Sequence, residues 1–383
     1  MPATDAELIA RARALAPAIR ARAAQTAEQR KPHDDSIRDL IDAELIQMFV
    51  PKRWGGSEAS LKTMLDVVEI ISAACPSTGW IAAFYISHNI YVAKFPEATQ
   101  EELFGPYGYT LLPAASAADM DARKVAGGWE VSGQASWGSG VMHADWVLMS
   151  GRAEDGPRSF LMPIENVEVI DNWHFAGMAG TGSNDYVARK VFVPDNHALT
   201  AMEFHGGSSE GSRIHANPLY SIPFLASAYC TILPVLTGSL KGAFAEFAQI
   251  IARRVRNFSG VVHKDQQQTH VTLGEFEIAT RAASELARAT YGCVDTILHS
   301  RPFELADRLA IKGQTAFISK LCRDTVNAMM GAAGASNFHL DQPLQRIWRD
   351  LNTVCSHAFW DWDVSREQTG RMQLGLPTNH PLI

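Results

Sequence analysis

The sequence has no long apolar run and no excess of positive charge. No stretch of its 383 residues approaches about 18 uninterrupted apolar positions, so no membrane span is predicted. Lys and Arg number 34 against 41 Asp and Glu, which gives a net charge of −7. This balance argues against nucleic-acid binding, because neutralising phosphates needs a basic surface. We therefore expect no membrane partner and no nucleic-acid partner.

Paired cysteines and a signal-peptide core are also missing. The start, Met1–Glu7, is acidic and lacks the apolar run of a signal peptide. The five cysteines are odd in number and far apart, and no C-x-x-C pair occurs, so neither a disulfide framework nor a zinc site is predicted. The thirteen histidines are scattered, and no metal site is expected. A reducing cytoplasm fits these features.

Motifs that would name several enzyme classes are absent. The sequence has no G-x-x-x-x-G-K-[ST] phosphate loop, no H-E-x-x-H and no G-x-S-x-G. The glycines of Gly177–Gly182 are in the wrong order for a dinucleotide-binding fingerprint and lie between strand candidates. These absences exclude classes without identifying one.

The composition changes twice along the chain and predicts three units of an α+β protein, with boundaries at residues 1–112, 113–205 and 206–383. The first is helical, with a helix over Leu61–Ala74 that ends before Pro76 and another that starts near Ser77. In the second, Val125–Val131 predicts a hairpin with a Gly-Gly turn. Further short strands there favour a small β-sandwich or barrel. They are Trp146–Ser150, Ser159–Pro163 and Val187–Pro194.

The last unit is helical again. Apolar residues from Leu233 to Ile251 recur at steps of three and four, as on one face of a helix. Similar patterns occupy Val271–Leu298, Leu305–Met330 and roughly Pro343–Met372. Four long amphipathic helices predict a four-helix bundle.

Several local signatures follow one another in the order found in one known fold. Each is weak alone, but the ordered set resembles the acyl-CoA dehydrogenase fold over nearly the whole chain. That resemblance implies a helical domain, a β domain and a C-terminal bundle. The segments are Pro51–Gly56, Gly127–Gly133, Trp137–Gly140, Gly180–Asp185 with Val191–Pro194, Gly331–Ala335, and Arg349-Asp350.

The base of the dehydrogenases has no counterpart here. Their glutamate would fall at Ala358, or at Ala228–Tyr229 in some relatives, and neither position holds a carboxylate. Ser356-His357 and Ser77–Trp80 instead resemble the flavin-dependent monooxygenases built on the same scaffold, the oxygenase halves of two-component systems.

This resemblance implies an enzyme that receives reduced FMN, or FAD, from a separate NAD(P)H-flavin reductase. With O2 it would form a C4a-hydroperoxide and hydroxylate an aromatic or heteroaromatic substrate. It also implies a homotetramer, a dimer of dimers with the cofactor at a subunit interface. Two alternatives stay open, an acyl-CoA dehydrogenase-like FAD flavoprotein and a catalytically silent scaffold.

The resemblance assigns catalytic roles to three side chains. His357 would contact the hydroperoxide or deprotonate a phenolic substrate, and its alternative is a core histidine satisfied by a carbonyl. Ser139, with Ser183, would hydrogen-bond the isoalloxazine edge, and the alternative is ordinary turn chemistry. His88 would face the substrate, with a core role as its alternative.

Further residues are candidates for binding. Trp137 and Trp173 would line the flavin or the substrate, although aromatic rings in a β domain are often core residues. Arg256 would bind the flavin phosphate or a substrate oxygen, unless it is a solvated surface arginine. The remaining candidates are Gly331 and Gly334 beside an adenine tail, and Phe84 and Phe359 beside the substrate.

Overall fold

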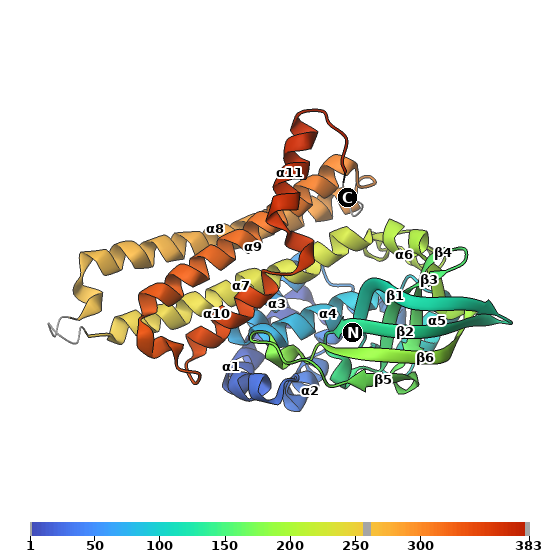
Figure 1. Ribbon diagram of the computed structural model, residues 1–383, viewed down its shortest axis with the longest axis horizontal. Helices are drawn as coiled ribbons and strands as arrows, with labels where there is room; N and C mark the ends of the chain where they lie inside the picture. Colours follow the sequence, from blue (N-terminus) through green and yellow to red (C-terminus); the bar gives the residue numbers. More distant parts are fainter. Residues whose placement is uncertain (1, 256–261, 380–383) are drawn as a thin grey trace.

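The computed structural model describes residues 2–255 and 262–379, apart from the side chains of residues 116–119. Its elements follow one another as helices, then strands, then helices. In Figure 1 the long helices α7, α8 and α9 lie side by side on the left, the sheet forms the right-hand side, and α11 rises above both. The mixed helix and sheet content confirms the α+β class.

A proline separates the helices α3 and α4 of the N-terminal part. The helix predicted over Leu61–Ala74 is confirmed as α3, and α4 follows after one residue. Cys75, with φ −154° and ψ 111°, is extended, as expected before Pro76, which then occupies the first turn of α4. The bounds are α1 Asp5–Gln29, α2 Asp34–Asp42, α3 Leu61–Ala74, α4 Pro76–Val92 and α5 Glu97–Phe104.

The strands form one seven-stranded sheet in the order β5-β6-β2-β1-β3-β4-β7. The predicted hairpin is confirmed, but its turn is Ala126-Gly127 and not Gly-Gly, because Gly128 already pairs with Val125. Gly127 has φ +76°, which favours glycine there. The pairing runs through a single sheet with β5 and β7 at its edges, so the sandwich or barrel is not seen in the strand order. The bounds are β1 Ala114–Val125, β2 Gly128–Gly138, β3 Trp146–Ala153, β4 Gly156–Pro163, β5 Val167–Ile170, β6 Asn184–Pro194 and β7 Ala198–Thr200.

The C-terminal helices pack around α7, which contacts α3, α8, α9 and α10. The predicted apolar stripe from Leu233 to Ile251 lies on α7 and is buried, except for the partly exposed Phe244. The bounds are α6 Ala201–Gly206, α7 Phe224–Arg253, α8 Gln267–Leu298, α9 Leu305–Ala333, α10 Pro343–Val354 and α11 Trp362–Gln373.

The expected single helix over Pro343–Met372 is wrong. Residues 355–361 leave the helix between α10 and α11. Trp360 is buried, and its indole N–H donates to the carbonyl oxygen of Val354 at 2.7 Å, which satisfies a group at the end of α10. The carboxylate of Asp361 then accepts from the backbone N–H of Val364 at 3.0 Å and starts α11 as its N-cap.

α7 is also long and apolar enough to cross a membrane by length and composition. Of its most apolar window, however, 89% is buried inside the protein, as in the core helix of a soluble protein.

Candidate functional site

One face of α4 carries four rings. Trp80, Phe84, His88 and Tyr91 are spaced by four, four and three residues, so they lie on one side of the helix. Their neighbouring ring centroids are 4.8, 4.8 and 5.0 Å apart. This stripe could be found in the sequence by its helical spacing.

Three more rings close the stripe into a loop of contacts. Phe224 at the start of α7 lies 5.7 Å from Tyr91 and 6.3 Å from Phe359. His357 lies 4.8 Å from Phe359 and 5.9 Å from Trp80. We call this set the aromatic circuit; its members are Trp80, Phe84, His88, Tyr91, Phe224, Phe359 and His357. Phe84, His357 and Phe359 are partly exposed in it.

The break between α10 and α11 brings His357 into the circuit. Its Nδ1 accepts the backbone N–H of Phe359 at 3.2 Å, which caps the short helical turn that follows. Burial lowers the pKa of His357 to about 4, so the ring is neutral at pH 7. In the neutral ring the proton then sits on Nε2, and His357 presents a hydrogen-bond donor.

His88 has the opposite tautomer. Its Nδ1 lies 2.6 Å from the carbonyl oxygen of Leu112 and must donate to it. Burial lowers the pKa of His88 to about 4, which keeps this ring neutral as well. Its Nε2 is therefore a lone-pair acceptor, and it has no hydrogen-bond partner among the residues that the structure describes.

A chain of hydroxyl groups starts at Trp80. The indole N–H donates to Oγ of Ser139 at 3.0 Å, and this oxygen lies 2.8 Å from Oγ of Ser183. Ser183 in turn lies 2.7 Å from the hydroxyl of Thr181, which donates to the carbonyl oxygen of Met178 at 2.8 Å. Ser139 is the partly exposed member, and Ser183 and Thr181 are buried. The chain links the turn after β2 with the turn before β6.

The turn before β6 is held by α10. Nη1 of Arg349 donates to the carbonyl oxygen of Ala176 at 2.6 Å, and the backbone N–H of Met178 donates to Asp350 at 2.5 Å. A Cβ on Gly177 would come within 2.2 Å of the carbonyl oxygen of Arg349, so only glycine permits this approach. Burial raises the pKa of Asp350 to about 6. The same helix that leads to His357 thus positions the hydroxyl chain.

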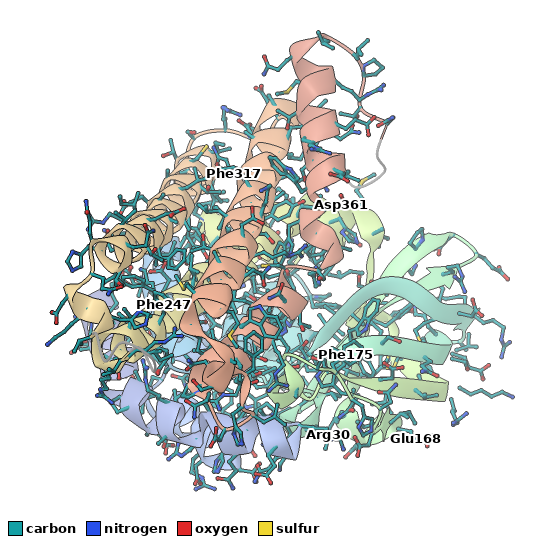
Figure 2. The ribbon with its side chains drawn as sticks, turned by 60° about the vertical axis from the view of Figure 1, so that its left-hand side comes forward. Arg30, Glu168, Phe175, Phe247, Phe317 and Asp361 are labelled. Atoms are coloured by element: carbon teal, nitrogen blue, oxygen red, sulfur yellow. The ribbon has the colours of Figure 1, made fainter. Side chains whose placement is uncertain are left out.

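The surroundings of this chain fit a flavin ring, which has apolar faces and a polar edge. Trp137 is 64% exposed at φ +65°, and Met142 and Phe175 are about half exposed. Figure 2 shows Phe175 where the helices meet the sheet. Apolar side chains exposed around the partly exposed hydroxyl of Ser139 suit a planar ring of mixed polarity.

Trp173 is a buried residue that hydrogen-bonds to the turn before β6. Its ring is buried, stacks on Phe175 with centroids 3.8 Å apart, and donates from Nε1 to the carbonyl oxygen of Met178 at 2.9 Å. None of its ring contacts joins it to the aromatic circuit. The expectation that Trp173 lines the substrate stays without a supporting contact.

The predicted glycines lie elsewhere in the subunit. Gly331 and Gly334 are at the far end of α9, and the twelve residues of α10, about 18 Å of helix, separate that end from the break that holds His357. Gly334 has φ +84° and packs against the guanidinium of Arg254, which donates to the carbonyl oxygens of Ala332 and Ala333. Arg256 lies outside the described residues.

Family models match the N-terminal and the C-terminal helical parts of the chain. Models of the acyl-CoA dehydrogenase N-terminal and C-terminal domains match residues 3–106 and 230–362. The chain is 38% identical to a pigment production hydroxylase of Rhodococcus sp. (strain ATCC 21145), over 100% of both chains. The chain belongs to the flavin-dependent monooxygenases of the acyl-CoA dehydrogenase fold.

Other relatives of this oxygenase have more specific names. It is 29% identical to the flavin-dependent monooxygenase oxygenase subunit HsaA of Rhodococcus jostii (strain RHA1), over 97% of this chain and 99% of the other. It is 28% identical to the FADH2-dependent resorcinol hydroxylase, oxygenase component, of Rhizobium sp. (strain MTP-10005), over 96% and 94%. The structure of XiaF from Streptomyces sp. with FADH2 and glycerol superimposes with a TM-score of 0.91 at 27% identity, over 98% and 97%.

The protein is thus a flavin-dependent monooxygenase that uses reduced flavin and O2, and a dehydrogenase function is not favoured. The positions where dehydrogenases carry their base agree with this. Ala358 follows His357, and Tyr229 lies 6.1 Å from Phe359, ring to ring, so the circuit borders both positions and meets no carboxylate at either.

Proposed function

We propose that this oxygenase takes reduced FMN, with FAD as the alternative, from a separate NAD(P)H-flavin reductase and hydroxylates an aromatic ring held at the aromatic circuit. One oxygen atom of O2 enters the substrate and the other leaves as water. The bound reduced flavin would supply the two electrons and activate the oxygen. The observation that carries the proposal is His357, a neutral hydrogen-bond donor beside the position where dehydrogenases keep a carboxylate base.

His357 acts as a donor in this proposal rather than as the base that removes a phenol proton. Its Nδ1 lone pair is used by the N–H of Phe359, so only Nε2–H faces a ligand. A fixed donor in a water-poor site stabilises negative charge that develops on an oxygen, and one such donor contributes roughly 10²–10³ in rate. The surrounding rings of Trp80, Phe359 and Trp360 limit the access of water to it.

Ser139 and Ser183 would hold the polar edge of the flavin, and Trp137 would cover one of its faces. Thr181 gives its only hydroxyl proton to Met178, so Ser183 donates to Thr181 and Ser139 donates to Ser183. Both serines therefore offer a lone pair, as acceptors, to a flavin N–H. Thr181 and Trp80, which sequence reasoning did not assign to the site, orient these serines from either end.

We also propose that the enzyme is a homotetramer in the cytoplasm. Gly331 and Gly334 are remote from His357 within one subunit, so in a dimer of dimers the pair from a neighbouring subunit would meet the cofactor tail. Phe338 and Leu340, next to Gly334, are 51% and 74% exposed, which is expected of a surface that another subunit covers. Light scattering of the purified protein tests the subunit number.

The activity is tested with the purified enzyme, a generic flavin reductase, NADH and a panel of phenols, indoles and sulfur heterocycles. We expect a product heavier by one oxygen atom, labelled when ¹⁸O2 is supplied. Omitting the reductase should abolish it. If every compound yields only hydrogen peroxide, or if an acyl-CoA thioester is oxidised instead, the proposal is wrong.

The flavin contact is tested by Ser183→Ala, with Ser159→Ala in β4 as a control outside the hydroxyl chain. Loss of one hydrogen bond of about 1 kcal/mol should weaken the binding of reduced flavin several-fold. Anaerobic titration measures this, and equal dissociation constants for the two variants would remove Ser183 from the flavin site.

A further inference from the structure

We propose that Arg308 and Lys312 on α9 form an anion site beside the aromatic circuit, and that the aromatic substrate carries a carboxylate that binds there. This inference rests on the proposed function and names the substrate class of the same site. Its basis is a pair of cations that the described part of the chain leaves without a counter-ion in contact.

Lys312 is a buried cation without a hydrogen-bond partner. Two lysines are buried in the described residues, Lys94 with 0% and Lys312 with 4% of its surface exposed. The ammonium of Lys94 donates to the carbonyl oxygens of Phe204 and Ile222, both at 2.9 Å. Lys312 has no hydrogen bond and no ion pair with any residue that the structure describes. A buried ammonium that has lost its water is strongly disfavoured unless it is paired, so an anionic ligand would stabilise this one.

Arg308 is a second unpaired cation on the same side of α9. It precedes Lys312 by four residues, so the two side chains lie one turn apart on one face of the helix. Its Nε is buried without a partner, and its guanidinium forms no ion pair within the described ranges. Lys320 on the same helix is, by contrast, paired with Asp324. A neighbouring ammonium and guanidinium are suitable donors for a carboxylate.

The face of α9 that carries Lys312 packs against the break between α10 and α11. About two turns further along this face, the carbonyl oxygen of Ser319 accepts from the thiol of Cys355 at 3.3 Å. Lys312 itself lies within the electrostatic reach of Asp361, the N-cap of α11, which Figure 2 shows at the lower end of that helix. The short helical turn just before Asp361 contacts α9 and contains Phe359 of the circuit. The cations are therefore beside the part of the break that contributes this ring.

The charges at this place match one carboxylate. Burial lowers the pKa of Lys312, and the carboxylate of Asp361 opposes that shift. Asp361 accepts from the backbone N–H of Val364 at 3.0 Å, and it forms no ion pair with Lys312. Two cations and one carboxylate leave one net positive charge, which a single carboxylate neutralises. A phosphate monoester carries about two negative charges and would exceed it, so the site favours an aromatic acid over the phosphate of the flavin.

The first test compares acids with amides that differ from them in charge and hardly in shape. The pairs are 3-hydroxybenzoate with 3-hydroxybenzamide, and 3-(4-hydroxyphenyl)propanoate with its amide. With the complete enzyme, reductase and NADH, we expect kcat/KM to be at least about tenfold higher for the acid in one pair or both, because the amide lacks the charge that pairs with Lys312. Amides that are hydroxylated as efficiently as the acids in both pairs would overturn the inference and leave the proposed function standing. If nothing in the wider panel is hydroxylated, the proposed function fails and this inference fails with it.

The second test removes the charges one at a time. Lys312→Met keeps an unbranched apolar side chain and loses the ammonium, so the ratio of acid to amide in kcat/KM should fall toward one. Arg308→Gln should lower the ratio several-fold. The matched control is Lys320→Met, an exposed position on the same helix, which should keep the wild-type ratio. A folded Lys312→Met variant that keeps this ratio as well would overturn the assignment.

Two further measurements on Lys312→Met separate substrate binding from other roles. The urea midpoint should not fall, because the substitution removes an unpaired buried charge. The dissociation constant for reduced FMN in anaerobic titration should equal that of wild type. A lower midpoint with an unchanged acid preference would make Lys312 a structural residue. Weaker flavin binding with an unchanged acid preference would assign the cations to the flavin phosphate, and either result would overturn the inference.

Discussion

His88 and His357 are the same side chain with opposite hydrogen-bonding polarity. A backbone carbonyl at Nδ1 makes His88 an acceptor at Nε2, and a backbone N–H at Nδ1 makes His357 a donor there. Burial lowers the pKa of both and keeps them neutral. The chemistry of each residue thus depends on one backbone group, of Leu112 in one case and of Phe359 in the other.

The dual role of His357 can be separated by two substitutions. In His357→Asn the amide oxygen can still accept from Phe359, but the side chain is too short to present a donor where Nε2 lies. We expect both His357→Asn and His357→Ala to lower the single-turnover yield of product about 100-fold. Only His357→Ala should also lose about 1 kcal/mol of unfolding free energy, because it lacks the cap.

Product yields read by mass spectrometry and urea unfolding curves measure the two effects. A normal yield from His357→Asn would exclude Nε2–H from catalysis.

At the scale of elements, α10 determines the position of both halves of the site. Its residues Arg349 and Asp350 hold the turn at Ala176–Met178, and its C-terminal end leads into the break that holds His357. The two halves are therefore placed relative to one another by a single rigid helix. Hydrophobic periodicity could not reveal this, because the break depends on the buried Trp360 and on the Asp361 cap.

The carboxyl of Asp350 makes this clamp sensitive to pH. Its pKa is raised from 3.8 to about 6 in the folded protein, because it is buried. Its contribution to stability is therefore fully present below pH 3.8 and is lost as the pH rises through 6. Asp350→Asn keeps an oxygen for the Met178 N–H and removes the buried charge, so it should be more stable than wild type at pH 7.5 by about 1–3 kcal/mol.

Chemical denaturation of Asp350→Asn and wild type at pH 7.5 and pH 4 tests this, and the difference should shrink at the lower pH. A variant that is less stable than wild type at pH 7.5 would mean that the charge itself holds the turn.

At the scale of the whole molecule, folding buries groups that titrate near neutrality. The folded-state pKa of His88 is lowered from 6.5 to about 4. The stability it contributes is complete above pH 6.5 and is lost as the pH falls through 4, because the folded state resists protonation of this ring. We expect the unfolding free energy of His88→Phe to fall less than that of wild type between pH 7 and pH 4.5. Denaturant titrations at both values measure this, and parallel curves would contradict the burial of a neutral His88.

The sequence alone determined the boundary between α3 and α4, the β1–β2 hairpin and the buried face of α7. Proline at position 76 ends one helix and begins the next, Gly127 makes the hairpin, and heptad-like spacing marks the buried face of α7. These features depend on residues a few positions apart, for which backbone stereochemistry and side-chain periodicity suffice. The absence of a carboxylate at Ala358 and at Tyr229 was likewise readable directly, and it separated the chain from the dehydrogenases.

The site was decided by the tertiary structure. The sequence proposed four members of the circuit: Phe84, His88, His357 and Phe359. Only folding joins them through Phe224, which is more than a hundred residues away in sequence from both Tyr91 and Phe359, the two rings it contacts. The link from Trp80 to Ser139 and the two imidazole tautomers depend on hydrogen bonds to groups on other elements. Such contacts follow from how helices and sheet pack, and no local pattern encodes which nitrogen of a histidine keeps its proton.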